Sequence, residues 1–109
     1  MKKNQTNLEI VSRRESITAR ANVKGNTVTF LYDKTDGQIQ AVAFSVQRGT
    51  QGSPEFMGIE AFRGTMYGEA FNVENNSYHI GDSAVYEEIY NICKEIINPE
   101  IKTENAESV

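Results

Sequence analysis

The strongest constraint on the fold is a strict alternation of apolar and polar side chains over residues 16–24. The apolar positions are Ile17, Ala19, Ala21 and Val23. Because successive side chains of a β-strand point to opposite faces, this period of two predicts a strand with one buried face. Gly25-Asn26 follows and predicts a two-residue hairpin turn, since glycine adopts positive φ without steric cost.

The returning strand of this hairpin is predicted over residues 27–33. A turn centred on Gly25-Asn26 sets small residues against large ones on the buried face, pairing Val23 with Val28, Ala21 with Phe30 and Ala19 with Tyr32. Residues 34–37 read Lys-Thr-Asp-Gly, which predicts a type I turn with its glycine in the left-handed conformation. A second hairpin therefore follows the first.

The third predicted strand, residues 39–46, is apolar on both faces. One face carries Ile39, Ala41 and Ala43, and the other carries Val42, Phe44 and Val46. A strand that is covered on both faces lies in the centre of a sheet. We expect a helix to pack closely on the alanine face, and Val42, Phe44 and Val46 to meet either the later strands or a second copy of the chain.

Residues 48–80 predict a loop followed by further strands. The loop is "GTQGSPE" after Arg48, because glycine, serine and proline cluster there. Residues 56–73 read as extended but contain Gly58, Gly64 and Gly68, which predicts either one bent strand or two short ones with a bulge near Gly64. A short last strand is predicted over residues 77–80.

A C-terminal helix is predicted from the Gly81-Asp82-Ser83 cap to Pro99. Its apolar positions recur at helical spacing and form one stripe: Val85, Ile89, Ile92, Cys93 and Ile96. Tyr86 and Tyr90 widen this stripe beyond what one core-facing helix needs. These two tyrosines, together with Val42, Phe44 and Val46, are therefore the candidate residues of a dimer interface.

The order of elements predicts an α+β fold, namely an antiparallel β-meander of about four to six strands with one C-terminal α-helix packed on one face. At 109 residues the chain has room for one domain, which we place at residues 8–98. Residues 1–7 are predicted to be a flexible N-terminus, and residues 99–109 a disordered acidic tail.

The composition predicts a cytoplasmic protein with no membrane segment. Lys2 and Lys3 are not followed by the apolar stretch of a signal peptide, and no apolar run approaches the roughly 20 residues of a transmembrane helix. The single cysteine, Cys93, lies on the helical stripe, where a packed and reduced thiol is the usual outcome.

Catalytic residues are scarce in this sequence. His79 is the only histidine, and there is no phosphate-binding glycine motif, dinucleotide fingerprint or zinc-ligand spacing. Glu55, Glu60 and Glu69 lie among glycines and suit exposed positions better than an active site. We therefore expect a protein that is not an enzyme and that uses no cofactor and no metal.

The charges are distributed unevenly along the chain. Residues 1–63 hold nine basic and six acidic side chains, a balance of +3, whereas residues 64–109 hold two and nine, a balance of −7. The basic half offers four candidate contacts for single-stranded nucleic acid: Arg13, Arg14, Arg20 and Lys24. The net charge of −4 argues against this function, because nucleic-acid-binding domains are usually basic.

Curved strands followed by one helix, dimerising through sheet and helix, resemble in outline the PUR and PC4-like single-stranded DNA-binding proteins. The resemblance lies in the order of elements, and it transfers no site residue to this chain. It implies that single-stranded nucleic acid is a partner to consider.

The triplet Arg-Gly-Thr occurs twice, beginning at Arg48 and at Arg63. If the two guanidinium groups converge in space, they form a candidate site for an anion or an acidic partner. A repeated triplet of this kind is also expected by chance in a chain of this length.

The leading hypothesis is a small non-catalytic binding or accessory protein that forms a homodimer and acts through protein contacts. It depends on the doubly apolar third strand and the wide helical stripe, which need more cover than one small chain supplies. The alternative is single-stranded nucleic-acid binding through a basic face of the sheet.

Overall fold

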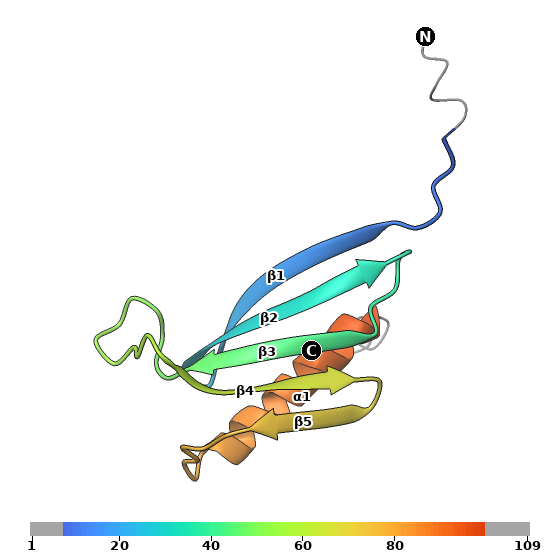
Figure 1. The fold of residues 1–109 in the computed structure, drawn as a ribbon. Coiled ribbons are helices and arrows are strands. Elements are labelled where there is room, and N and C mark those ends of the chain that lie inside the picture. The colour runs from blue at the N-terminus through green and yellow to red at the C-terminus, as the bar shows by residue number, and fades with distance from the viewer. Residues whose placement is uncertain (1–7, 100–109) are drawn as a thin grey trace.

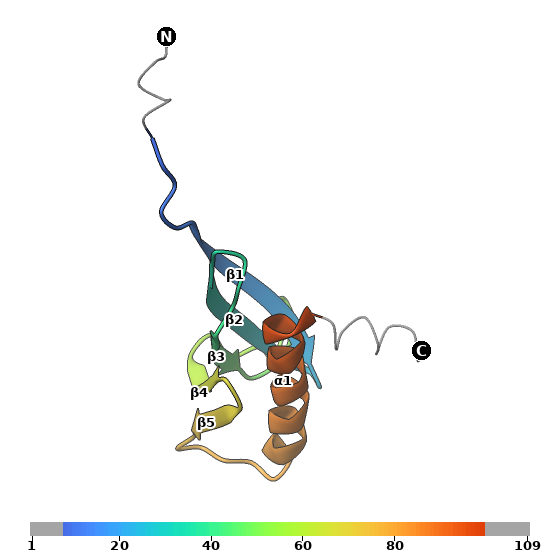
Figure 2. The ribbon, with the colours of Figure 1, turned by 90° about the vertical axis from the view of Figure 1, so that its right-hand side faces the viewer.

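The computed structural model describes residues 8–99, which form a sheet and a helix in two layers (Figures 1 and 2). The elements are β1 (Arg14–Val23), β2 (Asn26–Thr35), β3 (Ala41–Gln47), β4 (Glu60–Tyr67), β5 (Ala70–Glu74) and α1 (Asp82–Ile97). The five strands are antiparallel and lie in the order β1-β2-β3-β4-β5. The predicted α+β meander with one C-terminal helix is thus confirmed.

The predicted ends of the domain lie mostly outside this range. Residues 1–7, predicted to be a flexible N-terminus, and residues 100–109 of the predicted acidic tail are outside the described residues. Within residues 8–99 no helix has the length and apolar character needed to cross a membrane.

The turn between β1 and β2 lies one residue earlier than predicted. Val23 pairs with Asn26, so the two turn residues are Lys24 and Gly25, both at positive φ (50° and 85°). This conformation matches the twist of a hairpin, and the Asn26 side chain stabilises it by donating a hydrogen bond to the Val23 carbonyl oxygen (3.4 Å). The predicted pairing was therefore wrong by two residues.

Because the error is an even number, each side chain still lies on its predicted face. In the structure Ala21 pairs with Val28, Ala19 with Phe30 and Ile17 with Tyr32.

The second turn is also a two-residue turn with both residues at positive φ. Asp36 and Gly37 have φ values of 51° and 84°, and Thr35 and Gln38 exchange backbone hydrogen bonds across them (2.8 and 3.0 Å). The predicted type I turn is corrected accordingly. β3 then begins at Ala41, two residues later than predicted.

The glycine-rich segment forms two strands and not one bent strand. β4 and β5 are joined by a tight turn at Gly68, whose φ is 59°. The irregularity in the ladder lies between Val46 and Gln47 on β3, not near Gly64. Residues 77–80 form no strand, so that prediction was wrong.

The loop between β3 and β4 is tied back to the first hairpin by side chains. The Thr27 hydroxyl group donates to the Gly49 carbonyl oxygen (2.9 Å) and accepts from the Gln51 amide (3.1 Å). Asn22 Nδ2 donates to Thr50 Oγ1 (2.7 Å). These bonds hold the start of the loop against the end of the sheet.

The helix packs on the face of β3 opposite to the one predicted. Val42, Phe44 and Val46 are buried under α1, whereas the alanines of β3 lie on the other face. The remaining buried hydrophobic side chains come from four other elements: Val23, Val28, Phe30, Phe62, Met66, Val85, Ile89 and Cys93. The prediction that Val42, Phe44 and Val46 meet a second copy is therefore corrected, because the chain's own helix covers them.

The core has no room for a side chain at Gly64. A Cβ atom placed on Gly64 would overlap the Asn72 carbonyl oxygen and the Phe44 ring, which stacks on Phe71 with ring centroids 5.5 Å apart. The absence of a side chain on β4 thus makes room for the aromatic pair below it.

We predict that Gly64→Ala lowers the free energy of unfolding by about 2 kcal/mol, because backbone and a packed ring must both move to admit one methyl group. Denaturant unfolding followed by circular dichroism measures the change. Gly58→Ala is the matched control, since a Cβ atom added there would have no other atom within 4 Å and the φ of Gly58 is not positive. Equal stabilities of the two variants would contradict this account of the core.

Candidate functional site: the open face of the sheet

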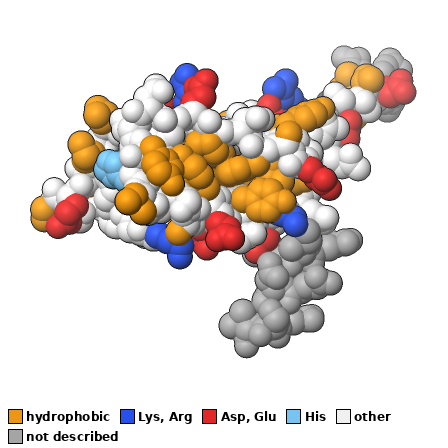
Figure 3. All heavy atoms as spheres, turned by 90° about the horizontal axis from the view of Figure 1, so that it is seen from below, with side chains coloured by type: hydrophobic (Ala, Val, Ile, Leu, Met, Phe, Trp, Pro, Cys, Tyr) orange, Lys and Arg blue, Asp and Glu red, His pale blue; other side chains and the backbone are white. Residues whose placement is uncertain are grey.

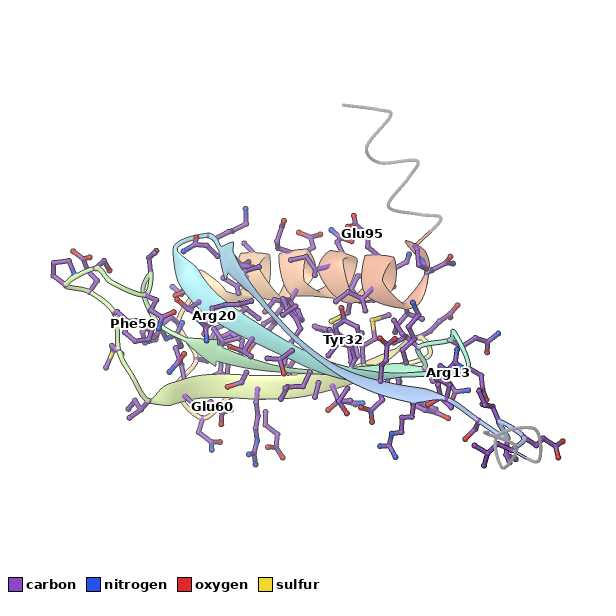
Figure 4. The ribbon with its side chains drawn as sticks, turned by 90° about the horizontal axis from the view of Figure 1, so that it is seen from above. Arg13, Arg20, Tyr32, Phe56, Glu60 and Glu95 are labelled. Atoms are coloured by element: carbon purple, nitrogen blue, oxygen red, sulfur yellow. The ribbon has the colours of Figure 1, made fainter. Side chains whose placement is uncertain are left out.

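Within residues 8–99, α1 leaves one face of the sheet uncovered, and we call it the open face. Figure 4 shows α1 on one side of the strands with Tyr32 between the layers, while Glu60 projects from the opposite side. The alternation of each strand assigns these residues to the open face: Arg14, Ser16, Thr18, Arg20, Asn22, Thr29, Leu31, Asp33, Ala41, Ala43, Ser45, Glu60, Arg63, Thr65, Tyr67, Asn72 and Glu74.

The centre of the open face is apolar and hollowed. Leu31 and Tyr67 are 48% and 61% exposed, although both are large and at least partly apolar. Two hollows adjoin on this face, and both are lined by Leu31, Ala43 and Thr65. Together they form one depression that extends on both sides of Leu31. The small side chains of Ala41 and Ala43 form its floor. A partner could therefore approach the backbone of β3 closely.

Two groups of ion pairs border this apolar centre. On one side, Arg14 pairs with Asp33 (2.6 Å), which also accepts a hydrogen bond from Ser16 (2.9 Å). The Arg14 hydrogen bond lowers the pKa of Asp33, and the Ser16 bond acts in the same direction. On the other side, Arg63 Nε lies 3.0 Å from Glu74 Oε1, and this hydrogen bond raises the pKa of Arg63.

Glu60 completes the second group. It lies 3.9 Å from the Arg63 guanidinium group and accepts a hydrogen bond from the Ser45 hydroxyl group (2.6 Å). The open face thus carries three arginines and three carboxylates, and its formal charge is balanced.

The four cations predicted to contact nucleic acid do not form one cluster with aromatic rings. Arg14 is paired with Asp33, and Lys24 lies in the turn after β1. Arg13 precedes β1 and is joined to Asp36 through its backbone amide (2.9 Å). Arg20 lies on the open face, where it donates to Gln51 Oε1 (2.8 Å).

Binding of single strands also requires exposed aromatic rings on which bases can stack. Phe44 and Phe62 are buried, and Phe56 is partly buried. Tyr67 lies exposed on the open face.

Arg48 and Arg63 do not converge, so the predicted shared anion site is not formed. Arg63 lies on the open face, whereas Arg48 follows β3 and turns toward α1. Arg48 forms a two-pronged ion pair with Asp82, with distances of 2.5 and 3.0 Å, and its guanidinium group lies 5.4 Å from the Phe62 ring centroid. Both arginines are already neutralised by carboxylates of the same chain.

Asp82 is the centre of a buried polar cluster at the start of α1. Its side chain is 2% exposed, and it also accepts hydrogen bonds from Asn75 Nδ2 and from the His79 amide, both at 2.9 Å. Arg48 makes a further bond to the Ser77 carbonyl oxygen (2.9 Å). The hydrogen bond from Arg48 holds the pKa of Asp82 well below its usual value, against the opposing effect of burial. We call this group the Arg48–Asp82 clamp.

We predict that Asp82→Asn is strongly destabilised at neutral pH, by about 3 kcal/mol, because Arg48 keeps its charge without a counter-ion. The folded-state pKa of Asp82 is depressed, so its contribution is present above the unfolded pKa of about 4 and is lost as pH falls below it. Denaturant unfolding at several pH values measures both effects. The variant should lack this acid-dependent loss.

Asp33→Asn is the control, because Asp33 also pairs with an arginine but its side chain is 40% exposed. It should change stability much less than Asp82→Asn. Similar losses in both variants would show that burial of the clamp does not decide its strength.

Tyr86 and Tyr90, the other candidate interface residues, are partly buried against the chain's own core. Tyr86 packs edge-on against Phe62 and accepts a hydrogen bond from Asn75 Nδ2 (2.8 Å). Tyr90 packs edge-on against Phe71. They line a hollow between β5 and α1, and Figure 3 shows a band of hydrophobic side chains on this side of the molecule. Their outer edges remain accessible.

The residues considered for metal binding and nucleophilic chemistry were the acidic side chains, His79 and Cys93. Within residues 8–99 no group of three or more His, Cys, Asp or Glu side chains could hold a metal ion. Cys93 is fully buried, and burial raises its pKa to about 12. Its thiol is packed in the core, as the helical stripe predicted.

We predict that Cys93 does not react with an aromatic disulfide reagent in the folded protein at pH 8, because its thiolate is scarce and inaccessible. Reaction should be stoichiometric in guanidinium chloride. The absorbance of the released aromatic thiolate measures the extent of reaction in the folded and in the denatured protein. Fast labelling under native conditions would contradict the buried position of this residue.

No protein-family model matches this chain, and neither a curated protein nor a solved structure shows significant similarity to it.

Sequence reasoning missed the residues that matter most on the open face. The signal for Leu31 was present, because it is an apolar side chain at a polar-face position between Thr29 and Asp33. Glu74 was not identified, and Tyr67 was not assigned to this face, because both placements depend on the two-strand arrangement of the glycine-rich segment. The Arg48–Asp82 clamp joins residues 34 positions apart, and no local pattern indicates such a contact.

Proposed function

We propose that this protein is a small non-catalytic binding or accessory protein that self-associates as a two-fold dimer through the open face of its sheet. The observation that supports this proposal is the exposed apolar centre of that face, formed by Leu31 and Tyr67 over the alanines of β3. An uncovered apolar patch bordered by polar side chains is typical of protein interaction sites.

The size of the open face suits a second copy. Five strands spaced about 4.8 Å apart, of five to ten residues each, cover on the order of 600 Å². Two copies facing each other would bury about 1,200 Å², which lies at the lower end of specific interfaces.

The charges of the open face also favour a copy of itself over a strongly charged partner. The face carries three arginines and three carboxylates, so its formal charges cancel. Two of the three arginines form ion pairs within the chain. A single-stranded nucleic acid requires cations that are free to contact phosphate groups, together with aromatic platforms. Arg20 and Tyr67 are the residues on this face closest to that requirement, and they belong to strands at different positions in the sheet.

We predict that light scattering after size-exclusion chromatography gives twice the 12.2 kDa mass of one chain. Leu31→Lys should shift the protein to monomer, because it places a charge in the apolar centre of the interface. Thermal unfolding by circular dichroism establishes that the variant is folded.

Ile80→Lys is the matched control, since Ile80 is 90% exposed and lies outside the sheet. It should leave the dimer intact. A wild-type chain that is monomeric at about 100 μM would contradict the proposal, because a functional dimer must form at concentrations below that. Salt-sensitive binding of a labelled single-stranded oligonucleotide that is lost in Arg20→Ala would favour the nucleic-acid alternative instead.

A further inference from the structure

The strand register arranges the open face in cross-strand rows. One row contains, from β1 to β5, the residues Arg20, Thr29, Ser45, Arg63 and Glu74. A neighbouring row contains Thr18, Leu31, Ala43, Thr65 and Asn72. Each row crosses all five strands, so its two end residues lie at opposite edges of the sheet.

The ends of the first row carry opposite charges that cannot meet within one chain. Arg20 and Glu74 are four strand spacings apart, about 19 Å, which exceeds the screening length of about 8 Å at physiological salt. Arg20 donates to the neutral Gln51 side chain. Unlike Arg14 and Arg63, it has no ion pair with a carboxylate in the described part of the chain.

The middle strand suggests how two open faces fit together. On this face β3 carries the small side chains of Ala41, Ala43 and Ser45 before its last residue, Gln47. Leu31 lies on β2 and Tyr67 lies on β4. A two-fold axis along β3 places β1 over β5 and β2 over β4 of the other copy. Leu31 then lies opposite the smaller Thr65 of the partner subunit, which is in the same row, and Ala43 lies opposite its own symmetry mate. Face-to-face sheets pack with their strands within about 30° of each other, so these rows remain approximately aligned.

With this arrangement we propose that Arg20 of each copy forms an ion pair with Glu74 of the partner subunit, so that two symmetric pairs set the register of the dimer. This inference rests on the proposed self-association through the open face. It adds the orientation of the two copies. Glu74 keeps its bond to Arg63 in the same chain, and its second carboxylate oxygen is the acceptor for the incoming guanidinium group.

The other simple orientation gives different contacts. A two-fold axis across the strands, at the level of Leu31, places Arg20 over Ser16 and Arg63 over Tyr67 of the partner subunit. It brings no Arg20 guanidinium group to a Glu74 carboxylate. The coupling between Arg20 and Glu74 therefore distinguishes the two orientations.

A double-mutant cycle on the dimer dissociation constant tests the inference. Sedimentation equilibrium at low salt, about 50 mM, preserves surface charge interactions and is carried out on wild type, R20E, E74R and the R20E/E74R double variant. Each single reversal should weaken the dimer by about tenfold or more, because it faces like charges across the interface. The double variant should recover to within about threefold of wild type, since both pairs are restored with their charges exchanged.

The K24E/E74R double variant is the matched control, because it changes the same charges at a residue in the β1–β2 turn, away from the open face. It should be as weak as E74R alone. R20Q and E74Q repeat the cycle without adding a positive charge beside Arg63, in case E74R disturbs the sheet.

The two proposals fail in different ways. A dimer in which the effects of R20E and E74R simply multiply would overturn the pairing while leaving self-association intact. A monomeric wild type would remove the proposed function and the pairing together. Recovery in R20E/E74R, absent in K24E/E74R, supports the orientation along β3, because the two residues are too far apart to interact within one chain.

Discussion

The position of the helix depends on the Arg48–Asp82 clamp. Arg48 follows the central strand and Asp82 begins α1, so their two-pronged pair attaches the start of the helix to the end of β3. Asn75 and the His79 amide satisfy the remaining acceptor sites of Asp82, and a buried carboxylate requires such partners. With this end held, Val85, Ile89 and Cys93 pack against one face of the sheet, and the helix leaves the opposite face uncovered.

Much of the architecture could be predicted from local patterns, because each hairpin has its own alternation and turn residues. The exact turn could not, since Lys24-Gly25 and Gly25-Asn26 both contain a glycine that tolerates positive φ. The hydrogen bond from the Asn26 side chain to the Val23 carbonyl oxygen is consistent with the turn at Lys24-Gly25. The sequence does not reveal this bond. The resulting error preserved the faces of all side chains, so the predicted buried side of the hairpin was still correct.

The face that the helix covers could not be decided in the same way. β3 is apolar on both faces, and close packing on its alanines was a reasonable expectation. The outcome depends on residues distant in sequence, because Phe62 and Met66 on β4 extend the Val42 face into a larger apolar surface. For the same reason the candidate interface moved from Val42, Phe44 and Val46 to Leu31 and Tyr67. Side chains that look alike in a strand acquire different roles from their neighbours across the sheet.

The meander has a consequence for how the chain reaches this structure. Every strand pairs with the strand next to it in sequence, so each hairpin forms by closing a loop of at most 12 residues. The clamp is different, because it joins residues 34 positions apart across two further strands. Bringing Asp82 to Arg48 therefore has the larger cost in chain entropy, and local pairing of the strands reduces that cost by shortening the path between them. The order of the elements lets the sheet assemble first and receive its helix last.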